Sequence, residues 1–269
     1  MKKYAVFGNP IAQSLSPTIH TMFAKSLNLD LQYDKILAPL DGFSQSIKDF
    51  FADVDALGCN VTVPFKEQAF QLADLKDNAA TMAKAANTLM YNDKGQLCAF
   101  NTDGVGLVAD LIANGNELKN AKILLLGAGG AARGVVHPLL AAGVDRLDIL
   151  NRTIAKADAI ANESNSNKVS AISKQSLAEH YDIVINSTSA SLEGRVPDVP
   201  ESVFVNCKTA YDMVYAKEPT SFLKFAGTAG AQNQLDGLGM LVEQAAAAFA
   251  IWTGKQPNTL PVIQFLRQR

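Results

Sequence analysis

The sequence predicts an α/β protein with two domains. Strand-like and helix-like segments alternate along almost the whole chain, a pattern typical of parallel sheets covered by helices. A second α/β series begins at Lys122, after the turn residues Asn114 and Gly115. The chain has 269 residues, of which 48% are hydrophobic and 19% charged, so it can bury one large core or two smaller ones.

The first series consists of short strands and helices up to residue 113. Pro17 favours a helix start, because an N–H in the first turn would have no partner within the helix. The sequence NDKG at 92–95 is turn chemistry and predicts a hairpin between its flanking extended runs. We predict strands over 4–7, 31–37, 59–63, 88–91 and 97–100, and helices over 17–27, 43–51 and 105–113.

The second series begins with a continuous apolar run at 123–126, as expected of a strand that is buried on both faces. Two prolines make the segment from 197 to 200 irregular. The helices at the end of the chain are expected to pack back on the first domain. We predict strands over 123–126, 146–150, 183–185 and 203–205, and helices over 131–142, 153–162 and 239–252, with a last short helix from Pro261.

Composition argues against several classes of protein. The net charge is −2 and no basic stripe is present, so we expect neither a nucleic-acid nor a membrane partner. No stretch approaches the ~18 apolar residues of a membrane span. Cys59, Cys98 and Cys207 are odd in number and scattered, and no zinc-ligand spacing occurs. We therefore expect reduced thiols, no metal and a cytoplasmic location.

A glycine-rich turn follows the strand at 123–126 and fits G-x-G-x-x-A. It comprises Gly127, Ala128, Gly129, Gly130 and Ala131, followed by Ala132. Its first glycine permits a tight turn, its second lets the backbone approach a pyrophosphate, and the helix N-terminus adds free N–H groups. In a βαβ context the motif predicts dinucleotide binding, although a tight turn that only packs strand on helix has the same residues.

The next strand ends at Asn151, Arg152 and Thr153, with Lys156 one helical turn later. An NAD-binding protein usually has a carboxylate at such a strand end to hold the ribose hydroxyls. No carboxylate is present at the end of this strand, whereas Arg152 and Lys156 are cations that suit a 2′-phosphate. The sequence therefore predicts NADP as the cofactor. The alternative is that Arg152 and Lys156 belong to a solvated face.

Two charged residues of the first domain follow predicted strand ends. Lys66 closes NVTVPFK near a helix start, where the helix dipole disfavours a cation. Asp103 lies in NTDG, also near a helix start. Taken singly, Lys66 is more simply interpreted as a surface lysine, and Asp103 as an acid that caps a helix. At the carboxyl ends of parallel strands, however, the two would face a ligand and could exchange a proton with a substrate hydroxyl.

Five motifs together resemble the shikimate dehydrogenase family, and the resemblance covers the chain from end to end. In order they are GNPI with SLSP at 8–17, NVTVPFK at 60–66, ANT at 86–88, NTDG at 101–104 and GLGMLVEQ at 237–244. Three positions depart from the usual pattern: Gln13, Ser191 and the run 215–220. Ser191 stands in a cofactor-side loop where relatives commonly have glycine.

The resemblance implies a role for each matching residue. Lys66 and Asp103 would be the catalytic pair and also contact the substrate. Further substrate contacts would come from Ser14, Ser16 and Tyr215 at the carboxylate, from Thr62, Asn87 and Gln244 at the ring hydroxyls, and from Asn60. The cofactor would be held by Gly127, Ala128, Gly129, Gly130, Ala131, Asn151, Arg152, Thr153, Lys156, Met213 and Gly237.

The activity implied is reversible reduction of 3-dehydroshikimate to shikimate with NADPH, in aromatic amino-acid biosynthesis. We assign 1–103 and 238–269 to an α/β substrate and catalytic domain and 104–237 to a Rossmann-type NADP domain, with the active site in the cleft between them. A broader quinate/shikimate dehydrogenase that uses NAD, or a catalytically silent NADP-binding regulator, is the alternative. We expect a monomer or homodimer.

Overall fold

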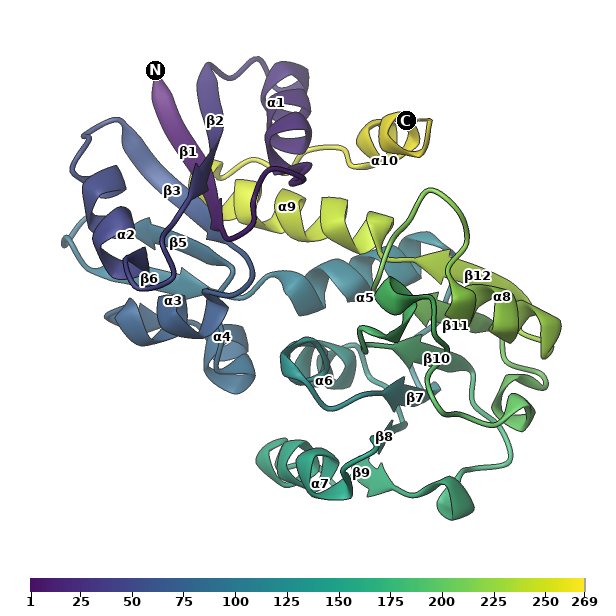
Figure 1. The fold of residues 1–269 in the computed structure, drawn as a ribbon. Coiled ribbons are helices and arrows are strands. Elements are labelled where there is room, and N and C mark those ends of the chain that lie inside the picture. The colour runs from purple at the N-terminus through teal and green to yellow at the C-terminus, as the bar shows by residue number, and fades with distance from the viewer. Residues whose placement is uncertain (269) are drawn as a thin grey trace. The chain divides into compact units, whose positions relative to one another are not determined.

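The computed structural model describes residues 1–268 and divides into two compact units (Figure 1). One unit comprises Met1–Gly106 and Val242–Arg269, and the other comprises Leu107–Leu241. Helices α5 (Asp103–Ala113) and α9 (Leu238–Thr253) contain the two boundaries, and α10 (Leu260–Arg267) ends the chain. Within residues 1–268, no helix is long and apolar enough to cross a membrane.

The first unit is built on a six-stranded sheet of order β2-β1-β3-β5-β6-β4. Its strands are β1 (Lys2–Gly8), β2 (Leu31–Leu37), β3 (Ala56–Val61), β4 (Leu75–Lys76), β5 (Thr88–Tyr91) and β6 (Leu97–Phe100). Its helices before α5 are α1 (Ser16–Ser26), α2 (Phe43–Phe51), α3 (Lys66–Leu72) and α4 (Asn78–Ala83).

The hairpin predicted at 88–100 is confirmed, because β5 and β6 pair antiparallel around the turn. In the same unit β5 also pairs antiparallel with β3, so this sheet contains both parallel and antiparallel pairs. A short hairpin returns the chain within the sheet, whereas a parallel pairing needs a longer crossover. The helix expected to start near Lys66 is α3, whereas the short elements β4 and α4 were not predicted.

An aromatic cluster packs α1 and α9 against the first sheet. The His20 ring stacks on Tyr33, with ring centroids 4.2 Å apart, and also lies near Phe23, Phe249 and Trp252. Neither ring nitrogen of His20 has a hydrogen-bond partner among the described residues. Burial lowers the pKa of His20 to about 3, so this side chain is neutral in the folded protein at neutral pH.

Acid should destabilise the fold through His20. The unfolded chain binds a proton on this histidine below about pH 6.5, whereas the folded protein binds it only near pH 3. The free energy of unfolding should therefore fall by up to about 1.4 kcal/mol per pH unit from this group in that window. Urea unfolding at pH 7 and pH 5 measures the fall. The variant His20→Phe should show a shallower pH dependence, and an identical slope would contradict this assignment.

The second unit has a six-stranded sheet that is parallel throughout, in the order β12-β11-β10-β7-β8-β9. Its strands are β7 (Lys122–Leu126), β8 (Arg146–Leu150), β9 (Val169–Ile172), β10 (Ile183–Asn186), β11 (Thr209–Asp212) and β12 (Asn233–Asp236). Its remaining α-helices are α6 (Gly130–Ala141), α7 (Ile154–Glu163) and α8 (Ser221–Thr228). This is the predicted Rossmann-type arrangement.

The strand predicted at 203–205 is wrong. Residues Glu201–Phe204 form a 3₁₀ helix, and the strand is β11, which begins at Thr209. The prediction followed the apolar side chains of Val203 and Phe204, which are buried in the core of this unit without belonging to its sheet. Apolar content alone does not separate a strand from a short helix.

Candidate active site

Lys66 and Asp103 form an ion pair in the first unit. Lys66 is the first residue of α3 and Asp103 is the first residue of α5. The Lys66 Nζ donates to Asp103 Oδ2 at 2.6 Å, and the two side chains are 30% and 20% exposed. A partly buried ion pair that still contacts solvent can donate a proton to a substrate and take up another proton from water. The two residues that the sequence singled out separately therefore form one hydrogen-bonded pair.

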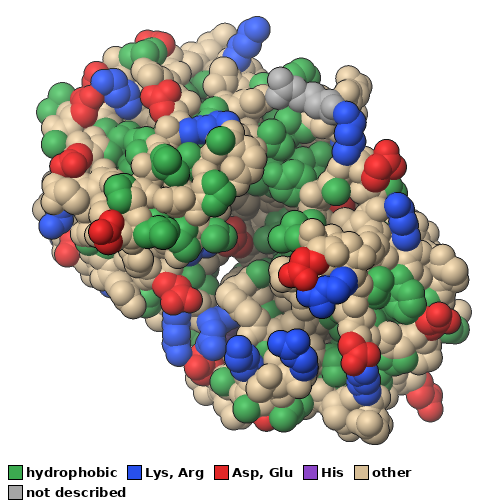
Figure 2. Space-filling model, in the orientation of Figure 1, with side chains coloured by type: hydrophobic (Ala, Val, Ile, Leu, Met, Phe, Trp, Pro, Cys, Tyr) green, Lys and Arg blue, Asp and Glu red, His purple; other side chains and the backbone are tan. Residues whose placement is uncertain are grey.

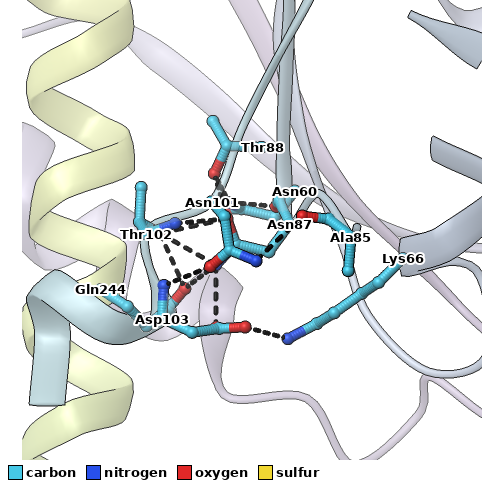
Figure 3. A network of polar contacts seen from close by, with 9 residues as sticks. All are labelled: Asn60, Lys66, Ala85, Asn87, Thr88, Asn101, Thr102, Asp103 and Gln244. Carbon is cyan, nitrogen blue, oxygen red and sulfur yellow. Dashed lines mark hydrogen bonds and ion pairs between the residues drawn. The ribbon is translucent and has the colours of Figure 1, made fainter. Parts of the chain in front are cut away.

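A network of polar side chains is hydrogen-bonded to Asp103 of this pair (Figure 3). The Asn87 Nδ2 donates to the second oxygen of Asp103 at 2.9 Å and to Gln244 Oε1 at 3.1 Å. Thr102 N donates to Asn87 Oδ1 at 2.9 Å, and Asn101 Oδ1 accepts from Asp103 N. Gln244 comes from α9, far along the chain, yet belongs to the same network as Asn87. The Gln244 side chain therefore contacts the residues around the ion pair.

Asn60 at the end of β3 has its hydrogen-bonding groups occupied inside the protein. Its Nδ2 donates to Asn87 O at 3.0 Å and to Thr88 Oγ1 at 3.1 Å, while its Oδ1 accepts from Tyr33 Oη–H at 2.7 Å. The residue is 6% exposed. An amide has two N–H donors, and both are used. These bonds let Asn60 support Asn87 and Thr88, and Tyr33 is a partner that no motif indicated; the substrate contact of Asn60 stays a prediction.

The other residues predicted at the substrate lie in both units. Ser14 and Ser16 lie together, with 3.2 Å between their hydroxyl oxygens. Ser14 Oγ also accepts from Ser16 N at 3.3 Å, so it contributes to the start of α1 as well. Thr62 is half-buried just after β3, whereas Tyr215 belongs to the second unit and is 40% exposed.

The glycine-rich turn lies between β7 and α6, and the backbone requires glycine at only some of its positions. Gly127 has a φ of +104°, and a Cβ there would come within 2.8 Å of Ser187 Oγ. Gly129, the N-cap of α6, has an extended conformation that any residue adopts, and a Cβ at Gly129 or Gly130 would meet no protein atom within 4 Å. The fold thus requires Gly127 but leaves open space before the N-terminus of α6, which fits a bound pyrophosphate.

Gly129→Ala should separate ligand binding from folding. A methyl group in the space before α6 should raise the dissociation constant for NADP⁺ on the order of tenfold or more, as overpacking does elsewhere. The melting temperature should stay within a degree or two, since no protein atom is displaced. Gly127→Ala is the matched contrast, because it should lower the melting temperature. Calorimetric titration and thermal unfolding measure both quantities, and unchanged NADP⁺ binding by Gly129→Ala would contradict this interpretation.

A pocket of about 630 Å³ opens beside this turn in the second unit. Among its lining residues are Gly127, Leu150, Asn151, Arg152, Ile172, Lys174, Thr188, Arg195, Val196 and Asp198. Three cations therefore line it against one carboxylate; that carboxylate pairs with Lys174, and Arg195 pairs with Glu193, which is not among the lining residues. Figure 2 shows Lys and Arg side chains in the lower half of the visible face, with Asp and Glu side chains among them. The excess of positive charge in the pocket lining suits a phosphate.

Two of these cations were not predicted. Lys174 follows β9 and Arg195 lies after the short 3₁₀ turn Ala190–Glu193, and neither segment carries a motif. Parallel pairing of β8 with β9 brings their carboxyl ends to one edge of the sheet, which places Lys174 beside the Arg152 segment. Of the predicted cations, Arg152 lines the pocket, whereas Lys156 is exposed on α7 and is not among its lining residues.

The structure brings Met213 and Gly237 together. Gly237 N donates to Val214 O at 3.2 Å, and a Cβ on Gly237 would lie 2.2 Å from Met213 O. Only glycine permits this approach without a shift of the backbone. The two residues predicted near the nicotinamide thus form one structural feature at the ends of β11 and β12.

Three family models match successive parts of the chain. The shikimate dehydrogenase substrate binding domain matches residues 6–89, shikimate/quinate 5-dehydrogenase matches 108–194, and the shikimate 5′-dehydrogenase C-terminal domain matches 237–266. The matches follow the order in which the motifs occur in the sequence.

Curated and solved relatives agree with these models. A protein of Alteromonas mediterranea named shikimate dehydrogenase (NADP(+)) is 53% identical and covers 99% of this chain, and the match covers 96% of that relative. The Ael1 enzyme of Pseudomonas putida has a TM-score of 0.95 at 43% identity, with 99% and 98% coverage. Shikimate 5-dehydrogenase of Thermus thermophilus, solved with NADP(H) and shikimate, has a TM-score of 0.89 at 34% identity, with 100% and 99% coverage. The chain belongs to the shikimate dehydrogenase family.

Proposed function

We propose that the chain reduces 3-dehydroshikimate to shikimate with NADPH, reversibly, as an oxidoreductase of aromatic amino-acid biosynthesis. The observation that carries the proposal is the Lys66–Asp103 ion pair at 2.6 Å, whose lysine lies within the residues matched by the substrate binding domain of this family. The curated relatives are named for the same activity and cofactor.

Lys66 supplies the proton of the reduction. When bound, NADPH supplies the hydride to the ring carbonyl carbon. The carbonyl oxygen gains negative charge as that bond forms, and Lys66 Nζ donates a proton to it, so that the ketone becomes a hydroxyl group. Both oxygens of Asp103 accept hydrogen bonds, from Lys66 and from Asn87, so its carboxylate orients the ammonium group. Lys66 regains its proton from solvent through its exposed fraction.

Neutral side chains hold the substrate around this pair. Ser14, Ser16 and Tyr215 present hydroxyl donors to the carboxylate, and no competing cation is needed. Thr62, Asn87 and Gln244 bind the ring hydroxyls, since each offers a donor and an acceptor. We assign Asn60 to the support of Asn87 and Thr88.

The cofactor site combines the turn and the pocket of the second unit. The turn from Gly127 to Ala131 holds the pyrophosphate at the N-terminus of α6. The strand end at Asn151, Arg152 and Thr153 holds the adenosine ribose and its 2′-phosphate, with Lys156 as a more distant cation. Lys174 and Arg195 extend the same cationic lining. Met213 and Gly237 approach the nicotinamide.

Two alternatives make different predictions in one set of assays. A broader quinate/shikimate dehydrogenase would oxidise quinate as efficiently as shikimate and would accept NAD. A silent regulator would bind NADP without turnover, although retention of both Lys66 and Asp103 argues against it. Initial rates with shikimate or quinate, each with NADP⁺ or NAD⁺, distinguish the three. We expect shikimate with NADP⁺ to exceed every other combination at least tenfold in kcat/KM.

The remaining assignments concern the domains and the cellular context. We propose that 1–103 with 238–269 bind substrate and that 104–237 bind NADP; the compact units change over close to these positions, after 106 and 241. We also propose a cytoplasmic monomer or homodimer with no nucleic-acid or membrane partner. The three free cysteines suit a reducing compartment.

A further inference from the structure

Asp212 is a buried carboxylate of the second unit that the proposed reaction does not use. It ends β11 and is 0% exposed. Its Oδ2 accepts from Ser191 Oγ and from Thr220 Oγ1, each at 2.6 Å, and its Oδ1 accepts from Asn186 Nδ2 at 3.0 Å and Val214 N at 3.1 Å. Four neutral donors thus hydrogen-bond one buried carboxyl group, whose oxygens are costly to leave without partners.

The donors come from segments on both sides of the carboxylate. Ser191 belongs to the loop after β10, which contributes Thr188, Ser189, Ala190 and Arg195 to the pocket lining. Thr220 is instead the N-cap of α8, where its hydroxyl also accepts from Leu223 N. The same carboxylate oxygen therefore holds a pocket loop by one bond and a helix start by another.

Asn186 holds the first part of the pocket loop by two hydrogen bonds. Its Oδ1 accepts from Thr188 N at 3.0 Å and from Thr188 Oγ1 at 2.7 Å. Beyond Thr188, Ser191 is tied to the sheet by two side-chain bonds: its Oγ donates to Asp212 Oδ2 at 2.6 Å and accepts a longer bond from Asn186 Nδ2 at 3.4 Å.

We infer that Ser191 is a positioning residue for the cofactor site: its hydrogen bond to Asp212 holds the 188–195 loop in the conformation that lines the NADP pocket. The inference rests on the proposed function. A loop without this bond would sample other conformations, and the binding-competent fraction would fall. The apparent affinity for the cofactor falls in the same proportion, while the step at Lys66 and Asp103 is unchanged.

The test compares Ser191→Ala with Thr220→Ala, which lose bonds of equal length to the same oxygen. Calorimetric titration of NADP⁺, with kcat and both KM values, should show a roughly tenfold higher dissociation constant and KM for NADP⁺ in Ser191→Ala. Its kcat and shikimate KM should stay within about twofold. Thr220→Ala should lower the melting temperature but leave NADP⁺ affinity within about twofold. Ser191→Thr, which keeps a hydroxyl group, should restore binding.

Each other outcome overturns the inference. Equal loss of NADP⁺ affinity in both variants would assign a general structural role to Asp212, and unchanged affinity in Ser191→Ala would remove the role of the bond. In either case a wild-type protein that binds NADP⁺ and turns over leaves the proposed function intact. A wild-type protein that binds no NADP⁺ would overturn both.

Discussion

Replacing Lys66 with alanine is expected to lower kcat for 3-dehydroshikimate reduction by on the order of 10²-fold or more, the usual scale for loss of an acid–base group. The KM for substrate should change less, because Ser14, Ser16 and Asn87 remain. Steady-state rates at saturating NADPH measure both. Near wild-type turnover in Lys66→Ala would show that another group supplies the proton.

A second lysine provides a matched control. Lys3 donates to Asp53 at 2.6 Å, the same distance as in the Lys66–Asp103 pair, but it lies at the start of β1 and is more exposed. Lys3→Ala should leave kcat unchanged. Asp103→Asn should also be slow, and the double variant with Lys66→Ala should cost less than the product of the two single losses, because both act on one proton. Multiplicative losses would indicate independent roles.

Arg152→Ala is expected to remove most of the preference for NADP over NAD. One hydrogen bond to a charged group contributes roughly 1.5–3 kcal/mol, which is on the order of 10- to 150-fold in binding. The kcat/KM with NADP⁺ should therefore fall in that range, while the value with NAD⁺ changes little. Raising the salt concentration should narrow the wild-type preference, because Arg152 is exposed and its contact is screened.

Further variants of the pocket compare how strongly its cations contribute to NADP⁺ binding. Lys174→Gln should weaken NADP⁺ more than Lys156→Ala, since Lys174 lines the pocket and Lys156 does not. A carboxylate introduced by Asn151→Asp should shift preference towards NAD, because it repels phosphate and can hold the ribose hydroxyls. Equal wild-type efficiency with NAD and NADP would overturn the role given to Arg152 and favour the quinate-type alternative.

Local chemistry made part of the fold predictable. The turn at 92–95 determined a hairpin whose strands lie where the sequence placed them, and the apolar run at 123–126 marked a central strand. The two edge strands of the second sheet, β9 and β12, carry mixed or polar sequences because one side of an edge strand lies open. Their residues therefore lacked the strand pattern, and both strands were missed.

The residues of the site likewise divide into those that sequence motifs identify and those whose place depends on the fold. Lys66, Asp103, Asn87 and the glycine turn stand in contiguous motifs, so short segments of sequence identify them. Lys174 has no such motif, and its place in the pocket depends on the register of β9 against β8. The role of Asn60 depends on Tyr33, 27 residues away in sequence. Tertiary pairing of this kind cannot be deduced from one sequence without the fold.

We propose that Lys66, beside Asp103, completes an NADPH-dependent reduction of 3-dehydroshikimate. The most direct test is the initial rate of NADPH oxidation with 3-dehydroshikimate, measured for the wild-type protein, Lys66→Ala and Lys3→Ala under one set of conditions. We expect rapid, substrate-dependent oxidation by the wild type and Lys3→Ala, and a loss of at least two orders of magnitude in Lys66→Ala. No substrate-dependent oxidation by the wild type, or equal rates for all three proteins, would contradict it.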